Sequence, residues 1–248
     1  MVERKLYSSK LLRTSHLSER TKHFEFEVPE MEKFDFAAGQ FISMVAPNPE
    51  NKQITRAYSV ASGPRGNTLF DLCLNRVEGG FFSNFLCDLQ DGAEVKFHGP
   101  HGLFVLRKPL RDCIFIATGT GVAPMRSFVE WLFWDKANPR HEGREIYLVY
   151  GTRYVEDMYY QEEFERTARE FPNFHYVMTL SRPPDGWKGE KGYVQDKVRD
   201  LLLQRPADQR NNLDAYICGL NDMVSANRDM LKNEFGWDKK QIIFERYD

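Results

Sequence analysis

An arginine, a tyrosine and a serine stand close together in the run Arg56–Ser59. The paired N–H donors of an arginine can hold a pyrophosphate, a tyrosine ring can stack on a flat ring system, and a serine hydroxyl can bond a ring nitrogen. In a strand, Arg56 and Tyr58 share one face and Ser59 points to the other. A flavin nucleotide needs these groups, although on this run alone an ordinary barrel strand is the stronger interpretation.

A second candidate is the glycine-rich turn Thr118–Pro124, which follows an apolar run and precedes an amphipathic one. Strand, turn and helix in this order present free backbone N–H groups to the phosphates of a dinucleotide. The turn lacks the G-x-G-x-x-G spacing, since Pro124 stands where the third glycine would fall. The acidic residue that would bind the ribose of NAD after the second strand is also absent. The turn therefore predicts a phosphate-binding loop without the full NAD fingerprint.

Further along the chain, Ser181 and Arg182 follow an apolar run, and Lys191 and Tyr193 come about ten residues later. A hydroxyl, a guanidinium, an ammonium and a phenol that converge near an adenosine would suit a ribose 2′-phosphate. The insertion Pro183–Gly186 marks the region as a loop, so a solvated loop is an equally good interpretation from these residues alone.

The segment Gly80–Leu86 has the small and polar residues of a helix start. Free N–H groups at such a start can bind phosphate, and Ser83 could assist them. Ser83 could equally be the N-cap of an ordinary helix, and the sequence does not separate the two hypotheses.

These residues need elements to position them, and the chain has two different patterns. Residues 1–107 contain short runs with partial alternation, separated by turn signals, which predicts a small antiparallel barrel with one helix over Phe82–Leu89. The expected strands are Leu6–Arg13, Thr21–Val28, Gln40–Ala46, Arg56–Ala61 and Leu69–Val77.

Residues 108–248 alternate strands and helices, and several strands are apolar on both faces, as buried parallel strands must be. This pattern predicts a doubly wound α/β domain whose ligand lies at the carboxyl ends of the strands. The expected strands are Cys113–Ala117, Glu145–Tyr150, Phe174–Leu180, Asp214–Cys218 and Gln241–Glu245. The expected helices are Ala123–Asp135, Gln161–Phe171, Val194–Leu203 and Asp222–Phe235.

Composition excludes several classes of protein. The 248 residues are 42% hydrophobic and 28% charged, with a net charge of −2, which is typical of a globular protein and argues against bulk nucleic-acid binding. The four cysteines form no C-x-x-C pair, so no metal site is expected. No apolar stretch reaches the length of a membrane span, and no secretion signal is evident. A cytoplasmic monomer with reduced thiols is expected.

Positive charge gathers near the start of the chain, at Arg4, Lys5, Lys10, Arg13, Arg20 and Lys22. These cations could keep a strand edge soluble or could dock an acidic protein, and the sequence favours neither.

Taken together, the segments resemble the plant-type ferredoxin–NADP⁺ reductase family over almost the whole chain. The resemblance is closest in Arg56–Ser59, Ser83–Pro100 and Ala117–Phe128. The family has an FAD-binding antiparallel β-barrel domain followed by an NADP-binding α/β domain. It implies a flavoenzyme that transfers electrons between NADPH and a one-electron carrier, an acidic ferredoxin or flavodoxin, and it implies ferredoxin–NADP⁺ reductase activity.

The resemblance also implies roles for residues at matching positions. Arg56 would bind the FAD pyrophosphate, Tyr58 would stack on the isoalloxazine, Ser59 would lie near flavin N5, and Ser83 would reach the FAD phosphates. The expected NADP(H) contacts are Thr120 and Gly121 for the pyrophosphate, and Ser181, Arg182, Lys191 and Tyr193 for the 2′-phosphate and adenine.

The expected catalytic residues are Ser59, Cys218, Glu245 and Tyr247. By resemblance Cys218 lies beside the nicotinamide, Glu245 supplies charge and a proton network, and Tyr247 covers the flavin face. Cys218 is also readable as an ordinary buried thiol. The chain departs from the family at Asp248, which extends past the tyrosine, and at Phe82, where a smaller residue is expected.

Two alternatives remain open from the sequence. One is an NADH-dependent reductase of a cytochrome or an oxygenase, because Thr179–Pro183 also resembles the cytochrome b5 reductases. The other is a subunit that relays electrons within a larger complex.

Overall fold

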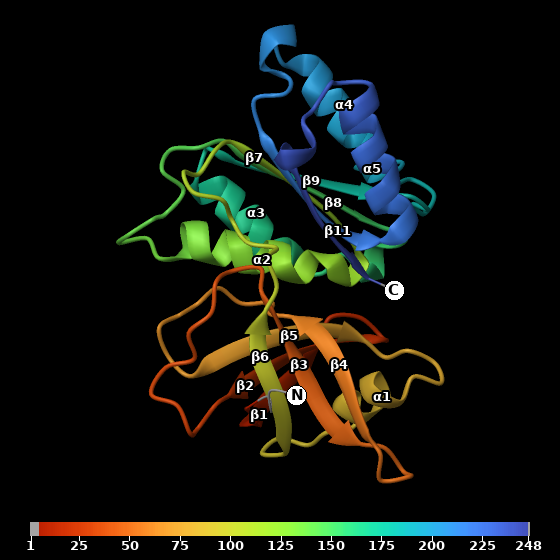
Figure 1. Cartoon of the computed structure of the whole chain (residues 1–248). Coiled ribbons are helices and arrows are strands. Elements are labelled where there is room, and N and C mark those ends of the chain that lie inside the picture. Colours follow the sequence, from red (N-terminus) through yellow and green to blue (C-terminus); the bar gives the residue numbers. More distant parts are fainter. Residues whose placement is uncertain (1–4, 248) are drawn as a thin grey trace. The chain divides into compact units, whose positions relative to one another are not determined.

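The computed structural model describes residues 5–247, which divide into two compact units. Unit 1 contains the residues up to Val105 together with Arg126–Trp131, and unit 2 contains Leu106–Met125 and the residues from Leu132 onward. The described residues form two six-stranded sheets, one in each unit (Figure 1). The sequence predicts an antiparallel barrel followed by a doubly wound parallel sheet, and this fold class is confirmed.

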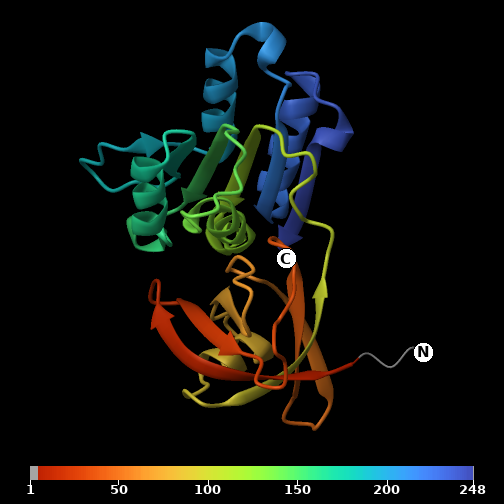
Figure 2. The same ribbon diagram turned by 90° about the vertical axis from the view of Figure 1, so that its left-hand side faces the viewer.

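The sheet of unit 1 is antiparallel and has the strand order β4-β3-β6-β1-β2-β5. A bridge between Val60 and Leu72 joins the ends of the order, as a barrel requires. The pairing of β1 with β2 shifts register between Leu11 and Arg13, and β1 is the curved red strand that follows the N-terminus in Figure 2. The strands are β1 (Tyr7–His16), β2 (Thr21–Glu27), β3 (Phe41–Pro47), β4 (Gln53–Ser59), β5 (Leu69–Asn75) and β6 (Glu94–His101).

Strand β6 is not among the strands expected from the sequence, although it pairs with both β3 and β1. Only Val95 and Phe97 carry its alternating apolar pattern, and Gly99 and Pro100 near its end resemble a turn. β4 begins three residues earlier than expected, and the sequence misses this start because Gln53 and Thr55 are polar and exposed. Both errors follow from strands whose burial is set by their neighbours rather than by their own composition.

Helix α1 (Phe81–Cys87) covers one part of the barrel core with Phe82, Leu86 and Cys87, which are buried. The core beneath it is aromatic, and Phe34 has three ring contacts within it. The departure expected at Phe82 therefore serves the core, since the Phe82 ring packs against the ring of Tyr58 with centroids 6.2 Å apart.

The sheet of unit 2 is parallel throughout, with the order β10-β9-β8-β7-β11-β12. From the central β7 the chain first proceeds to β8, β9 and β10, and then returns to the other side of β7 for β11 and β12. Such a reversal marks the point where a doubly wound sheet binds its ligand. The strands are β7 (Cys113–Thr118), β8 (Ile146–Thr152), β9 (Phe174–Leu180), β10 (Glu190–Lys191), β11 (Asp214–Leu220) and β12 (Ile242–Tyr247).

In the described part of the chain, three α-helices lie wholly in unit 2, namely α3 (Gln161–Glu170), α4 (Val194–Gln204) and α5 (Asn221–Asn233). A fourth helix, α2 (Val122–Val129), begins in unit 2 and ends in the segment that belongs to unit 1 (Figure 1). One face of the unit 2 sheet packs against α4 and α5 through a shared apolar core. The ends of α3, α4 and α5 lie within two residues of those that the periodicity predicts. The helix expected over Ala123–Asp135 is a composite, because a 3₁₀ turn at Gly119–Gly121 leads into α2 and a π turn at Glu130–Trp134 ends it.

The four cysteines are free and buried. Among residues 5–247, no helix is long and apolar enough to cross a membrane, and no cluster of three metal-ligating side chains occurs.

Candidate functional site

Two of the residues expected to hold a flavin share one face of β4. Tyr58 is half-buried, and its pKa is raised by burial, while the positive charge of Arg56 acts in the opposite direction. Arg56 is exposed and therefore available to a phosphate. The guanidinium and the phenol ring thus lie near one another, as the strand period predicts.

Ser59 ends β4 and is buried, with 5% of its surface exposed. It pairs with Phe41 of β3, and Phe41 pairs in turn with His101 of β6. Ser59 is thereby withdrawn from water, and its contact with a flavin stays a prediction.

Ser83 does not cap α1, so that hypothesis is wrong. The N-cap is Gly80, and Ser83 lies three residues later. Its hydroxyl accepts a hydrogen bond from the Val77 backbone N–H at 3.0 Å and faces the Gly80 carbonyl oxygen at 3.3 Å. Ser83 therefore secures the Gly79–Gly80 turn, and whether it also contacts a phosphate stays a prediction.

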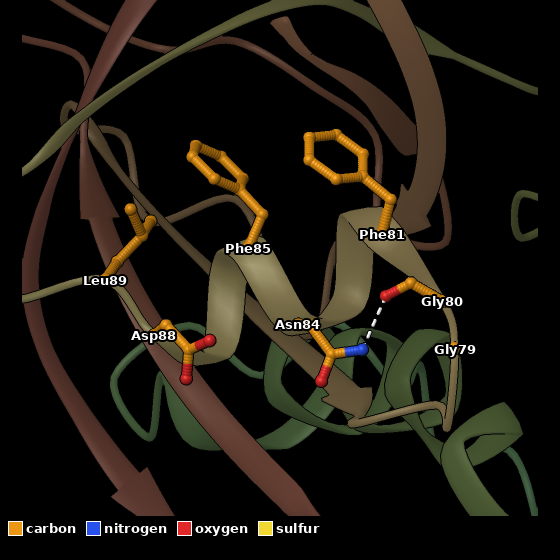
Figure 3. Close-up of a pocket in the computed structure, with 7 residues that line it drawn as sticks. All are labelled: Gly79, Gly80, Phe81, Asn84, Phe85, Asp88 and Leu89. Carbon is orange, nitrogen blue, oxygen red and sulfur yellow. Dashed lines mark hydrogen bonds between the residues drawn. The ribbon is translucent and has the colours of Figure 1, made fainter. Parts of the chain in front are cut away.

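A pocket of about 540 Å³ lies beside this turn (Figure 3). Phe81, Phe85 and Leu89 form its apolar side, while Asn84 bonds the Gly80 carbonyl oxygen at 2.6 Å through its side-chain nitrogen. The three expected flavin contacts on β4 do not line it. Phe82, whose ring packs against Tyr58, does not line the pocket either.

In unit 2, the glycine turn follows β7 and depends on one close approach and one positive φ. A Cβ on Gly121 would lie 2.3 Å from the Cys218 carbonyl oxygen, so only glycine fits. Gly119 has a φ of +53°, with open space where its Cβ would be. The buried Tyr150 hydroxyl lies 3.1 Å from the Gly119 carbonyl oxygen and holds the turn from below.

This turn fits a dinucleotide pyrophosphate. Its open side carries no Cβ at Gly119, and the first N–H groups of a helix have no acceptor within the helix. The buried Thr118 hydroxyl at the end of β7 has no hydrogen-bond partner among the described residues. Thr120 and Gly121 lie at the switch point between β7 and β11, and their contact with a pyrophosphate stays a prediction.

Cys218, Glu245 and Tyr247 come together at the carboxyl ends of β11 and β12. Cys218 pairs in register with Glu245, and the Tyr247 hydroxyl hydrogen-bonds the Cys218 thiol. Burial, helped by the negative charge of Glu245, raises the pKa of the Cys218 thiol well above its ordinary value, while the bond from Tyr247 opposes this. The thiol is fully buried and stays protonated at neutral pH.

The four residues expected at the 2′-phosphate gather at the carboxyl ends of β8, β9 and β10. The Ser181 N–H donates to the Thr152 carbonyl oxygen at 2.9 Å, and the Gly192 N–H donates to the Leu180 carbonyl oxygen at 2.9 Å. Arg182 is exposed, Lys191 lies at the end of β10, and Tyr193 is 63% exposed at the N-cap of α4. The loop after β9 and the segment at the end of β10 therefore bring a hydroxyl, two cations and a phenol to one edge.

Two tyrosines at this edge are not among the residues expected from the sequence. Tyr150 supports the glycine turn, and the Tyr154 hydroxyl accepts a hydrogen bond from Arg182 at 3.3 Å. The only signal in the sequence is their position around the end of an apolar strand, where Tyr150–Arg153 replaces the expected acidic residue.

The chain is similar to known flavin oxidoreductases along most of its length. The oxidoreductase FAD-binding domain matches residues 8–106, and the oxidoreductase NAD-binding domain matches residues 115–229. The chain is 37% identical over 253 residues to ferredoxin–NADP reductase B of Sorangium cellulosum, covering 100% of both. It is 30% identical to a component of the Na⁺-translocating NADH-quinone reductase of Klebsiella pneumoniae, covering 92% of this chain but 57% of that protein.

A solved structure of ferredoxin–NADP⁺ reductase from Plasmodium falciparum with 2′P-AMP has the same fold. Its TM-score is 0.81 at 24% identity, over 98% of this chain and 97% of that one. The expected family is therefore confirmed. The chain belongs to the ferredoxin–NADP⁺ reductase family of flavin oxidoreductases and carries an FAD-binding domain followed by an NAD(P)-binding domain.

Proposed function

We propose that this protein is a ferredoxin–NADP⁺ reductase that exchanges electrons between NADPH and a small one-electron carrier protein of the ferredoxin or flavodoxin class. The observation that carries the choice of NADPH is Arg182, an exposed guanidinium that is held at the carboxyl edge of the sheet with Ser181, Lys191 and Tyr193 around it. A ribose 2′-phosphate is the part of NADPH that needs these groups, and NADH lacks it.

In unit 1, the chain supplies binding and orientation. Arg56 provides paired N–H donors for the FAD pyrophosphate, and the Tyr58 ring, supported by Phe82, provides a surface for the flat ring system. Ser59 offers one hydroxyl from a site that is almost free of water. FAD, when bound, accepts a hydride and can release electrons one at a time, which matches a two-electron donor to a one-electron carrier.

In unit 2, the glycine turn binds the pyrophosphate of the coenzyme, and residues on β11 and β12 position the nicotinamide. Thr120 and Gly121 bind the pyrophosphate through backbone N–H groups. Cys218 contributes an uncharged thiol surface, because its pKa is raised, and Glu245 contributes a carboxylate beside it. Tyr247 fixes the thiol through its hydroxyl. Positioning of the nicotinamide is the main contribution that these three residues can make.

The carrier is inferred from the relatives more than from the surface. Among the N-terminal cations, Arg13 pairs with Glu25 at 2.7 Å, and Lys22 donates to the Cys87 carbonyl oxygen. Lys10 is exposed, and Arg4 lies outside the described residues. The Sorangium relative is named a ferredoxin–NADP reductase, and it supports an acidic iron–sulfur carrier as the partner. We expect the chain to act alone, as a monomer.

A carrier-coupled assay tests this function. The purified, FAD-loaded chain is mixed with NADPH or NADH, a ferredoxin or a flavodoxin, and cytochrome c as the final acceptor. Reduction that requires the carrier and is faster with NADPH supports the proposal. Carrier-independent reduction of a quinone with NADH would replace it by the activity that the Klebsiella relative's name describes, and activity only within a larger complex would favour a relay subunit.

A further inference from the structure

The backbone around Tyr154 is fixed by the end of β8. The buried Thr152 hydroxyl donates to the Tyr154 carbonyl oxygen at 3.0 Å. The same carbonyl accepts the Asp157 N–H at 3.2 Å, because Tyr154 is the N-cap of a 3₁₀ turn over Val155–Asp157. Tyr154 is thus an exposed ring on an immobilised piece of backbone.

The neighbouring loop is tied to the same backbone. The N–H groups of Ser181 and Arg182 donate to the carbonyl oxygens of Thr152 and Arg153, at 2.9 Å and 3.0 Å. These two bonds lie directly beyond Thr152 and Leu180, the last pair of the parallel β8–β9 ladder. The 3.3 Å bond from the Arg182 guanidinium to the Tyr154 hydroxyl therefore joins two segments whose backbones are already in register.

The acceptor of that bond is uncharged, whereas other arginines of the described chain bind carboxylates. Arg199, for example, forms two bonds of 2.8 Å and 2.9 Å with Glu234, and Arg65 bonds both Asp71 and Glu130. Within residues 5–247, no carboxylate pairs with Arg182, and the nearby Glu190 is bound to Lys197 at 2.7 Å. A phenol fixes the guanidinium without neutralising it and leaves its other N–H donors for an anion.

We propose that Tyr154 is a positioning residue that holds the Arg182 guanidinium ready for the 2′-phosphate of NADPH and thereby sets the preference for NADPH over NADH. Without the phenol, Arg182 would sample several rotamers. Ordering its side chain would then cost entropy and weaken the binding of NADPH. This inference rests on the proposed use of NADPH. It assigns to Tyr154 an action through Arg182 rather than a contact with the coenzyme.

The variant Tyr154→Phe removes only the hydroxyl, and the chain offers a matched control. The Tyr147 hydroxyl accepts a bond from Arg205 at the same distance, 3.3 Å, near the opposite end of β8. Tyr147→Phe therefore breaks the same kind of contact away from the proposed site. The test compares wild type, Tyr154→Phe, Tyr147→Phe, Arg182→Ala and the double variant of Tyr154 and Arg182, all as the full FAD-loaded chain.

Calorimetric titration with adenosine 2′,5′-bisphosphate and with 5′-AMP separates the phosphate from the nucleoside. We expect Tyr154→Phe to weaken binding of the bisphosphate by about three- to tenfold, the range for one ordinary hydrogen bond, and to leave binding of 5′-AMP unchanged. Tyr147→Phe should change neither. In the Arg182→Ala background, Tyr154→Phe should have no further effect on binding. As a single variant in turnover, Tyr154→Phe should raise KM for NADPH while kcat stays constant.

The outcomes separate this inference from the proposed function. If Arg182→Ala leaves the bisphosphate affinity intact, the proposed NADPH site itself is wrong. If Arg182→Ala weakens binding but Tyr154→Phe does not, the site stands and the role of Tyr154 is refuted. If Tyr154→Phe still weakens the bisphosphate in the Arg182→Ala background, Tyr154 contacts the phosphate directly, which also contradicts the positioning role.

Discussion

The carboxyl edge of the unit 2 sheet has two differently built ends. Around β7, β11 and β12 the site is made of backbone contacts and buried groups, with Gly121 against the Cys218 carbonyl and a fully buried thiol. Around β8, β9 and β10 it is made of exposed side chains, including Arg182 and Tyr193. We infer that this fold can bind the part shared by NADH and NADPH through close backbone contacts, and can distinguish the two coenzymes through exposed charged side chains.

We expect the largest effect at the end of the sheet around β7, β11 and β12, which we call the closed end. Gly121→Ala would place a Cβ 2.3 Å from the Cys218 carbonyl oxygen, and neither backbone can yield cheaply. We expect a loss of about 3 kcal/mol in the free energy of unfolding and no measurable 5′-AMP binding. Thermal unfolding and calorimetry check both results.

Gly119→Ala is the control for this prediction, because open space surrounds its Cβ and only its φ of +53° opposes the change. It should cost about 1 kcal/mol. Equal losses in the two variants would show that turn conformation, and not the close approach to Cys218, governs the closed end.

The second prediction concerns the end of the sheet around β8, β9 and β10, which we call the open end. Arg182→Ala should raise KM for NADPH by about 10- to 100-fold, the range for a lost bond to a charged group, while KM for NADH stays the same. Because the guanidinium is exposed, added salt should shrink the difference between wild type and variant. If the difference in KM between wild type and Arg182→Ala does not depend on salt, the bound phosphate is shielded from solvent. That result would contradict the exposed character of the open end.

The smallest effect concerns the buried thiol and pH. Burial raises the pKa of Cys218 in the folded chain above its ordinary value of 9.0. Below that value both states keep the proton, but above it the unfolded chain loses the proton first, so the stabilisation disappears as pH rises. Relative to Cys218→Ser, wild type should lose up to about 1.4 kcal/mol between pH 8 and pH 10.

Denaturant titrations of wild type and Cys218→Ser at both pH values measure this change. A gap between the two proteins that does not vary with pH would show that Cys218 ionises freely in the folded chain.

Parts of this site could be predicted from the sequence, for clear physical reasons. The strand Cys113–Ala117 is apolar on both faces, so its burial and the glycine turn after it were evident. The bond between Arg182 and Tyr154 joins residues 28 positions apart, and it depends on the parallel pairing of β8 with β9. Sequence periodicity predicts strands but not which of them become neighbours, and for this reason Tyr154 was missed.

In unit 1, sequence alone predicts the shared face of a strand but not the role of a serine near a helix start. Arg56 and Tyr58 could be placed on one face because a strand has a fixed period. The role of Ser83 could not be decided, because a capping serine and a phosphate-binding serine have the same sequence signature. The structure shows a third arrangement, in which Ser83 bonds the Val77 backbone.

The most direct test of the account is an anaerobic titration of the FAD-loaded protein with NADPH and, separately, with NADH, followed by the visible absorbance of the flavin. The account predicts that NADPH bleaches the flavin at a concentration at least about tenfold lower than NADH does, since only NADPH carries the phosphate that Arg182 binds. Equal or better bleaching by NADH would contradict the assignment of the open end. A purified chain that shows no flavin spectrum after FAD is added would contradict the role of Arg56–Ser59.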